Sequence, residues 1–220
     1  YYHCVMVCDR QHTHSYVATD ATCSGLQILA GLARDANTAR LVNVLPSECP
    51  QDAYKVVADH ASPSCPASIK EHMDRKVVKR VVMTIPYNAK PYSNRGYIRD
   101  ALKEKGIEIS NDDLNATVRA VRNTMRAVVP GPMAVMKWIE DEVAKAIDKG
   151  KTYLEWVTPS GFVVHQKLMK KDIQRIDLQL LGRCVMSVAT PSDTRVDKTH
   201  HKNATAPNLI LGEPFHDHGS

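Results

Sequence analysis

The chain lacks the features that would place it among secreted or membrane proteins. It contains six cysteines, but no two form a Cys-x-x-Cys pair, and their spacing does not suggest a disulfide framework. No apolar run approaches the ~20 residues of a membrane-spanning helix, and no segment reads as a secretory signal peptide. We therefore expect a cytoplasmic protein whose cysteines are reduced.

Aromatic side chains are also scarce. They make up 5% of the chain, and two of them are phenylalanine, whereas hydrophobic residues as a whole reach 43%. This composition predicts a substantial core that is mainly aliphatic. The 220 residues suffice for one large domain or two small ones. The chain opens with Tyr1 and resembles mid-domain sequence from the start, so we expect a piece of a larger protein.

Positive charge is concentrated in one stretch. The chain has a net charge of +5, yet residues 70–105 alone contain ten Lys or Arg and four Asp or Glu, a net charge of +6. A local basic patch is the electrostatic footprint of a phosphate-binding surface. The alternative is a solvated helix face, which is the usual role of a run of charges.

The first half of the chain reads as one strand and several helices. Residues 15–20 suggest a short strand, and a helix is expected from Ser24 or Gly25 to about residue 33. Another helix is expected over residues 51–60, followed by a Pro- and Ser-rich break at 62–66 that suggests a linker. Residues 70–85 then read as a basic helix that a proline terminates.

The second half combines helices with a β-hairpin. Ser110 and Asp113 resemble a capping box that opens a helix. One face of that helix is apolar and consists of Leu114, Val118, Val121 and Met125. The pattern further predicts a helix from Pro132 to Gly150, a hairpin over 152–168 and a strand over 173–181, with a turn-rich end.

The most informative pattern is a set of residues spaced four apart: Arg75, Lys79, Met83 and Tyr87, with Arg80 beside them. On an α-helix each step of four advances about 40° around the axis, so these residues share one broad face. Such a face can hold a polyphosphate at its cationic end and stack a base at its aromatic end. The alternatives are solubility for the cations and core packing for Met83 and Tyr87; for Met83 we favour core packing.

Four motifs occur in one order along the chain: Asp-Ala-Thr-Cys-Ser-Gly-Leu-Gln at 20–27, the set just described, Trp-Val-Thr-Pro-Ser-Gly-Phe at 156–162, and Ala-Pro-Asn-Leu at 206–209. Together they resemble the single-subunit, bacteriophage-type DNA-directed RNA polymerases, a family that includes mitochondrial enzymes. The resemblance extends to about residue 210.

The resemblance implies a mostly helical α+β piece of a right-hand polymerase with a small β-hairpin. Residues 1–50 would be palm, 51–208 fingers, and 209–220 a truncated or atypical return to the palm. The parent enzyme would be a monomer that copies a DNA template into RNA from nucleoside triphosphates. It would come from a DNA phage and act in the cytoplasm of a bacterial host.

The resemblance also implies a metal site. Asp20 would be the first of two catalytic aspartates and, with the backbone carbonyl of Ala21, a ligand of Mg²⁺. Nucleotidyl transfer uses two such ions, and Mg²⁺ prefers hard oxygen ligands with phosphates and water completing its shell. Judged alone, an isolated Asp before a helix is more often a cap.

Further roles follow for the four-spaced set. Lys79 would contact the triphosphate and protonate the pyrophosphate leaving group, and Arg75 would hold the outer phosphates through bidentate contacts. Arg80 would add positive charge or brace the helix. Tyr87 would stack near the incoming or template base, with its hydroxyl near the sugar.

Two alternatives stay open. DNA polymerases of the same superfamily usually carry Glu five residues after the first catalytic Asp; here that position is Gly25, which leaves room for a 2′-OH and favours ribonucleotides. The family's second catalytic Asp is missing after Ile210, although His216-Asp217 faintly echoes its motif. A non-catalytic nucleic-acid-binding remnant is therefore the other alternative, and we expect the 220-residue chain alone not to polymerise.

Overall fold

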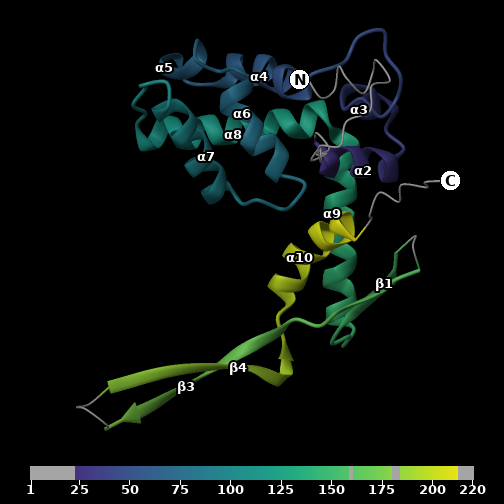
Figure 1. The fold of residues 1–220 in the computed structure, drawn as a ribbon, viewed down its shortest axis with the longest axis vertical. Coiled ribbons are helices and arrows are strands. Elements are labelled where there is room, and N and C mark those ends of the chain that lie inside the picture. Colours follow the sequence, from purple (N-terminus) through teal and green to yellow (C-terminus); the bar gives the residue numbers. More distant parts are fainter. Residues whose placement is uncertain (1–22, 159–160, 180–183, 213–220) are drawn as a thin grey trace, which may run out of the picture.

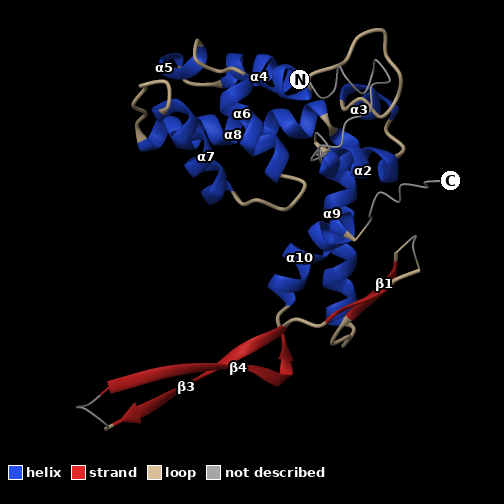
Figure 2. Ribbon diagram, in the orientation of Figure 1, coloured by secondary structure: helices blue, strands red, loops and turns tan. Residues whose placement is uncertain are grey.

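The computed structural model describes residues 23–158, 161–179 and 184–212. These residues form a mostly helical α+β structure, as the sequence predicts. A body of helices α2–α8 sits at one end, and α9 leads away from it with α10 alongside (Figure 1). Two β-hairpins lie at the far end, and the longer one projects away from the helices (Figure 2). None of the described helices is long and apolar enough to cross a bilayer.

The chain enters the described region through two short helices. Helix α2 spans Ser24–Ala33, which confirms the expected start, and it ends where Arg34 takes a left-handed φ of 51°. Helix α3, Ala36–Leu41, was not expected. It begins at Asp35, whose carboxylate accepts hydrogen bonds from backbone N–H groups of the first turn, as an N-cap does.

The segment between these helices and the basic stretch forms part of the core. Helix α4 spans Ala53–Ala61, the 3₁₀ turn η1 Ser62–Ser64, and α5 Ala67–Lys70. The predicted linker at 62–66 does not separate two cores, because residues on both sides of it pack into one cluster. Each helix buries one apolar face in that shared cluster.

Helix α6 spans Arg75–Thr84, five residues shorter at its start than predicted. The reason is Asp74, whose side chain accepts from the N–H of Val77 at 3.1 Å and so caps the helix there. The predicted stop before Pro86 is confirmed, because the last helical residue is Thr84.

Three longer helices complete the helical part. Helix α7 spans Pro91–Lys103, α8 Asn111–Val128 and α9 Pro130–Asp148. The cap of α8 is confirmed, since Ser110 accepts from the N–H of Asp113 at 3.1 Å. Its predicted apolar face is confirmed as well, because all four of its residues are at most 4% exposed.

The strands pair as two antiparallel hairpins. Strand β1, Leu154–Val157, pairs with β2, Val163–Gln166, as predicted. Strand β3, Met169–Leu178, overlaps the strand predicted over 173–181, whereas its partner β4, Cys184–Val196, was not predicted. Helix α10, Lys198–Leu211, follows where a turn-rich end was expected.

Asp35 ties α3 to the start of α9. Its Oδ2 accepts from the hydroxyl of Thr38 at 2.6 Å and from the N–H of Gly131 at 3.2 Å. A Cβ at Gly131 would lie 2.6 Å from the Asp35 side chain, so only glycine allows this approach. The Thr38 hydroxyl and the backbone N–H groups hold the pKa of Asp35 below its usual value.

We expect Asp35→Ala to lower the free energy of unfolding by about 1–2 kcal/mol at pH 7, through loss of the cap and of the bond to Gly131. The pKa of Asp35 is lower in the folded state than in the unfolded state. The ionised carboxylate therefore stabilises the fold at pH values above the unfolded-state pKa, and this contribution is lost as the pH falls through the folded-state pKa. Urea unfolding at pH 7 and pH 3 should show the difference from wild type shrinking in acid. Asp59→Ala, at an exposed position of α4, is the control. An equal difference at both pH values would contradict a role for the carboxylate.

Candidate nucleotide-binding site

The motif that follows Asp20 and the end of the four-spaced set meet in space. Gly25 is buried in α2, and a Cβ built on it would lie 2.8 Å from Cβ of Pro86 and 3.3 Å from Cε2 of Tyr87. The hydroxyls of Ser24 and Tyr87 share a hydrogen bond of 3.2 Å across 63 residues of sequence. The space beside the α-carbon of Gly25 is therefore filled by the segment that carries Tyr87.

The turn after α6 has a defined geometry. The N–H of Tyr87 donates to the carbonyl of Thr84 at 3.1 Å, and that of Asn88 donates to Ile85 at 2.8 Å. Asn88 has a φ of 61°. Asparagine tolerates this left-handed conformation better than most other residues with a side chain.

Asn88 also connects this turn to α9 and α10. Its Nδ2 donates to Oε1 of Glu140 and to the carbonyl of Asn203, both at 3.1 Å. Pro207 lies inside α10 and has no N–H to donate to the carbonyl of Asn203, four residues earlier. The side chain of Asn88 supplies the donor that the proline lacks. Sequence reasoning missed this link, although a proline within a helix signals a freed carbonyl.

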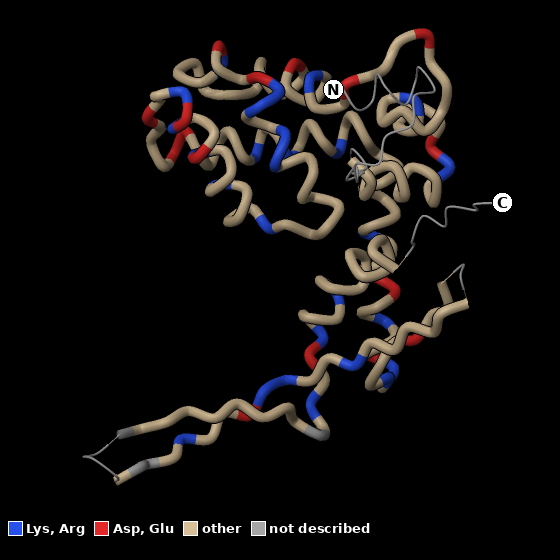
Figure 3. Tube along the Cα trace, in the orientation of Figure 1, with Lys and Arg blue, Asp and Glu red and all other residues tan. Residues whose placement is uncertain are grey.

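Helix α6 divides into a buried and an exposed face. Val77, Val78, Val81 and Val82 are fully buried, and the exposed arc carries the cations of the four-spaced set. Figure 3 shows the cations of α6 as neighbouring blue segments within the helical body. The core interpretation of Met83 is wrong: its side chain is 38% exposed, because it lies in the middle of the arc opposite the valines.

The cations of this face differ in their partners. Arg75 donates from Nε to Oδ2 of Asp52 at 2.7 Å and lies over the ring of Tyr54 at 5.1 Å. Arg80 lies over the ring of Tyr97 at 5.3 Å. Among the described residues, Lys79 has no hydrogen bond or ion pair. Its ammonium group is therefore available to a ligand.

Tyr54 lies between the start of α2 and the start of α6. Burial raises the pKa of the Tyr54 hydroxyl, and it raises the pKa of the Cys23 thiol, which is hydrogen-bonded with Tyr54. Both groups are accordingly neutral at pH 7. Cys23 is thus a packed thiol, as expected for a reduced cysteine, and not a nucleophilic thiolate.

The predicted metal ligands Asp20 and Ala21 lie outside the described residues, and so do the expected strand at 15–20 and Asp217. Within the part of the chain that the structure describes, no group of three His, Cys, Asp or Glu side chains could hold a metal ion. Along the chain, the described helix nearest to Asp20 and Ala21 is α2, which begins at Ser24.

Sequence reasoning also missed a group of arginines on α7 and α8. Arg95 comes from α7, and Arg119, Arg122 and Arg126 come from α8; together they line one pocket. The spacing of three and four residues in α8 could have indicated it, because such residues share one face of the helix, here beside the predicted apolar face.

The chain is similar in sequence to known proteins over nearly its whole length. Residues 7–212 match the family described as DNA-dependent RNA polymerase. The chain is 34% identical to the mitochondrial DNA-directed RNA polymerase of Homo sapiens, with 90% of this chain and 17% of the human protein covered. It is 30% identical to a chloroplast DNA-directed RNA polymerase of Nicotiana sylvestris, with 90% and 22% covered.

A phage enzyme is also similar. The DNA-directed RNA polymerase of Enterobacteria phage K11 is 25% identical, with 88% of this chain and 28% of the phage protein covered. The chain thus spans less than a third of the length of these relatives. Because the family match covers nearly the whole chain, the chain belongs to the DNA-dependent RNA polymerases of the phage and mitochondrial type.

Proposed function

We propose that the protein containing this chain is a DNA-directed RNA polymerase that copies a DNA template into RNA from nucleoside triphosphates. The observation that carries the proposal is the meeting of Gly25, Pro86 and Tyr87, beside a helix whose Lys79 has no carboxylate partner among the described residues. The names of the relatives support the reaction. The proposal retains the division into palm to residue 50, fingers over 51–208 and palm return from 209.

Lys79 is the residue that we propose binds the triphosphate and protonates the pyrophosphate leaving group. An ammonium group on an exposed helix face, without a competing carboxylate, can donate to phosphate oxygens at little cost. Arg75 can bind the outer phosphates only by exchanging Asp52 for them, because the two side chains form an ion pair. Arg80 adds positive charge from its place over Tyr97.

Tyr87 is the residue that we propose stacks on a base, with its hydroxyl near the sugar. The hydroxyl bonds to Ser24, so the ring has a fixed position next to α2. Gly25 contributes by allowing this approach, since any larger residue would push Pro86 and Tyr87 away. We attribute the preference for ribonucleotides to this placement of Tyr87 together with the small residue at 25.

Asp20 and the carbonyl of Ala21 are the ligands that we propose for Mg²⁺, and these oxygen donors fit the preference of that ion. When bound, Mg²⁺ supplies Lewis-acid activation of the attacking 3′-hydroxyl and charge neutralisation at the triphosphate. We further propose a monomer that acts in the cytoplasm of a phage-infected bacterium, on the basis of the phage relatives.

The proposal is tested by the binding of a fluorescent ribonucleoside triphosphate to the 220-residue chain in the presence of Mg²⁺. Lys79→Ala is expected to weaken binding by roughly tenfold to a hundredfold, the loss of one charge-assisted hydrogen bond of about 1.5–3 kcal/mol. Lys76→Ala is the matched control, because Lys76 lies on the same helix but pairs with Glu104 at 2.9 Å.

An unchanged affinity in Lys79→Ala, with weaker binding in Lys76→Ala, would contradict the assignment. Competition with deoxyribonucleotides separates the two polymerase alternatives: a strong preference for dNTPs would favour a DNA polymerase. Binding of nucleic acid without any binding of triphosphates would favour the non-catalytic remnant.

A further inference from the structure

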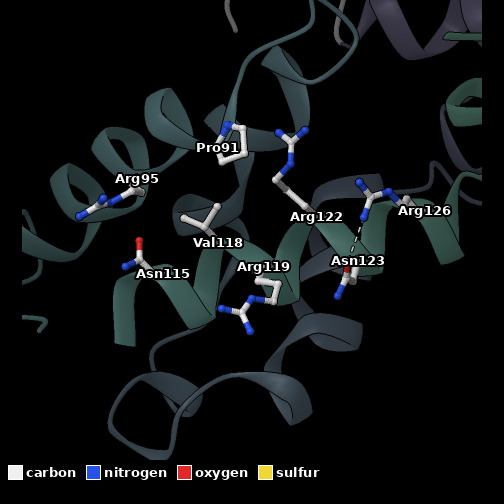
Figure 4. Close-up of a pocket in the computed structure, with 8 residues that line it drawn as sticks. All are labelled: Pro91, Arg95, Asn115, Val118, Arg119, Arg122, Asn123 and Arg126. Atoms are coloured by element: carbon white, nitrogen blue, oxygen red, sulfur yellow. Dashed lines mark hydrogen bonds between the residues drawn. The ribbon is translucent and has the colours of Figure 1, made fainter. Parts of the chain in front are cut away.

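Arginines make up half of the residues that line a pocket of about 290 Å³ between α7 and α8 (Figure 4). Its lining contains no aspartate or glutamate among the described residues. The lining residues are Pro91, Arg95, Asn115, Val118, Arg119, Arg122, Asn123 and Arg126. The pocket is thus lined by four arginines, two asparagines and two small apolar residues.

Half of these side chains come from one narrow face of α8. At about 100° per residue, Asn115, Arg119, Arg122 and Arg126 fall within roughly 60° of the helix circumference. At 1.5 Å per residue, Arg119 and Arg126 are about 10 Å apart along the axis. The arginines therefore form a strip, which we call the α8 strip and define as Arg119, Arg122 and Arg126.

The charge of this pocket is not neutralised by carboxylates of the described residues. Arg122 donates to the carbonyl of Ala89 at 2.9 Å and to Oδ1 of Asn94 at 2.6 Å. Arg126 donates to Oδ1 of Asn123 at 3.0 Å. All of these acceptors are neutral, and within the described parts of the chain no ion pair involves an arginine of the pocket.

Three basic residues nearby differ in this respect. Arg75 and Lys76 of α6 and Lys105, which follows α7, each form an ion pair with an aspartate or a glutamate at 2.6–2.9 Å. Burial is the main reason that the pKa of Arg122 is lowered, and repulsion by the nearby charge of Arg126 adds to it. An anion in the pocket would relieve that repulsion.

The pocket adjoins the candidate nucleotide-binding site. Arg122 holds the carbonyl of Ala89, two residues after Tyr87. One side of the α8 strip is therefore fixed to the turn on which the base-stacking residue sits. A polymer bound along the strip would pass next to that turn.

We propose that the pocket and the α8 strip bind the phosphodiester backbone of a nucleic acid strand, independently of its sequence. Guanidinium groups suit phosphate oxygens because their planar fork donates two hydrogen bonds at once. A length of about 10 Å accommodates successive phosphates of one strand, which are spaced ~3.4 Å along the axis of duplex DNA.

The walls of the pocket argue for the backbone as ligand. Its described lining contains no aromatic side chain on which a base could stack, so it offers a base little beyond Pro91 and Val118. Contacts to phosphate position a strand without reading its sequence. We identify this strand as the template, and that identification rests on the proposed function. The binding of nucleic-acid phosphates in the pocket does not rest on it.

The experiment measures binding of a fluorescein-labelled single-stranded DNA oligonucleotide to the 220-residue chain by anisotropy over a range of salt concentrations. The test variant is Arg119→Gln with Arg126→Gln, both at exposed positions, so the fold is retained. The charge-matched control is Arg34→Gln with Arg40→Gln, at two exposed positions, the first directly after α2 and the second in α3.

The test variant should bind at least about tenfold more weakly at low salt, and the slope of log K against log salt should fall by roughly 1.4, about 0.7 for each phosphate that is no longer neutralised. Two oligonucleotides of unrelated sequence should be affected equally, and the control should keep the wild-type slope. Arg119→Lys with Arg126→Lys should retain most of the affinity, because the charges remain.

A test variant that binds the oligonucleotide like the control would overturn the proposal. So would a variant that loses affinity for inorganic pyrophosphate alone, because the pocket would then be a site for free polyphosphate. Affinity for ribonucleoside triphosphates, measured in parallel, should not change in the test variant. If Lys79→Ala fails to alter triphosphate binding while the slope still falls here, only the proposed function is contradicted.

Discussion

Gly25→Ala is expected to lower the free energy of unfolding by about 1–3 kcal/mol, the cost of forcing an extra carbon into a packed site. The new Cβ would lie 2.8 Å from Cβ of Pro86, closer than two such carbons can approach, so α2 and the turn must separate. Helix propensity by itself would favour the substitution, because alanine is preferred over glycine within a helix by about 1 kcal/mol. A net loss of stability therefore isolates the steric contact.

The same substitution should weaken binding of a ribonucleoside triphosphate by about tenfold or more, as expected if the displaced Tyr87 costs ~1.4 kcal/mol of binding. Separation of α2 from the turn also breaks the hydrogen bond between Ser24 and Tyr87. Urea unfolding measures the first effect and fluorescence anisotropy measures the second.

Gly31→Ala supplies the matched control in the same helix. A Cβ at Gly31 meets nothing within 4 Å, so this variant should be more stable than wild type by up to about 1 kcal/mol and should bind nucleotide normally. If Gly25→Ala were also stabilising, the contact between Gly25 and Pro86 would not exist in solution.

Leu114→Ala is expected to have the largest effect on stability, about 3 kcal/mol or more. Leu114 is fully buried in the main hydrophobic cluster, and truncation removes buried apolar surface and leaves a cavity. Against a total stability of roughly 5–15 kcal/mol, this loss removes a large part of the free energy of unfolding.

The comparison is with Leu32→Ala in α2, where the leucine is 49% exposed. That variant should stay within about 0.5 kcal/mol of wild type, as surface substitutions usually do. Denaturant unfolding followed by circular dichroism gives both values. Similar reductions in the two variants would mean that Leu114 does not lie in a closely packed core.

Helices with strong local signals could be predicted from the sequence. Helix α8 combines a cap at Ser110 with a regular apolar face, and both features act within a few residues, so local reasoning found them. Helix α10 could not be found in this way. Pro207 is unfavourable inside a helix, and what offsets it is the side chain of Asn88, which lies 115 residues before the carbonyl that it binds.

The candidate site was predictable in kind but not in detail. The spacing of Lys79 and Tyr87 indicated a shared face. Only the fold reveals that Arg75 forms an ion pair with Asp52 and that the side chain of Met83 is exposed. Pairing partners depend on elements that are distant in sequence. The arginines of α8 were not predicted, because the same helix was interpreted only through its apolar side.

The bond from Asn88 to the carbonyl of Asn203 has a consequence for cooperativity. If the turn after α6 opens, a carbonyl inside α10 loses the donor that replaces the missing N–H of Pro207, and if α10 frays, Asn88 loses a constraint on its left-handed backbone. Opening of either element therefore destabilises the closed state of the other. The turn and the helix thus form one unit of local unfolding, although they are distant in sequence.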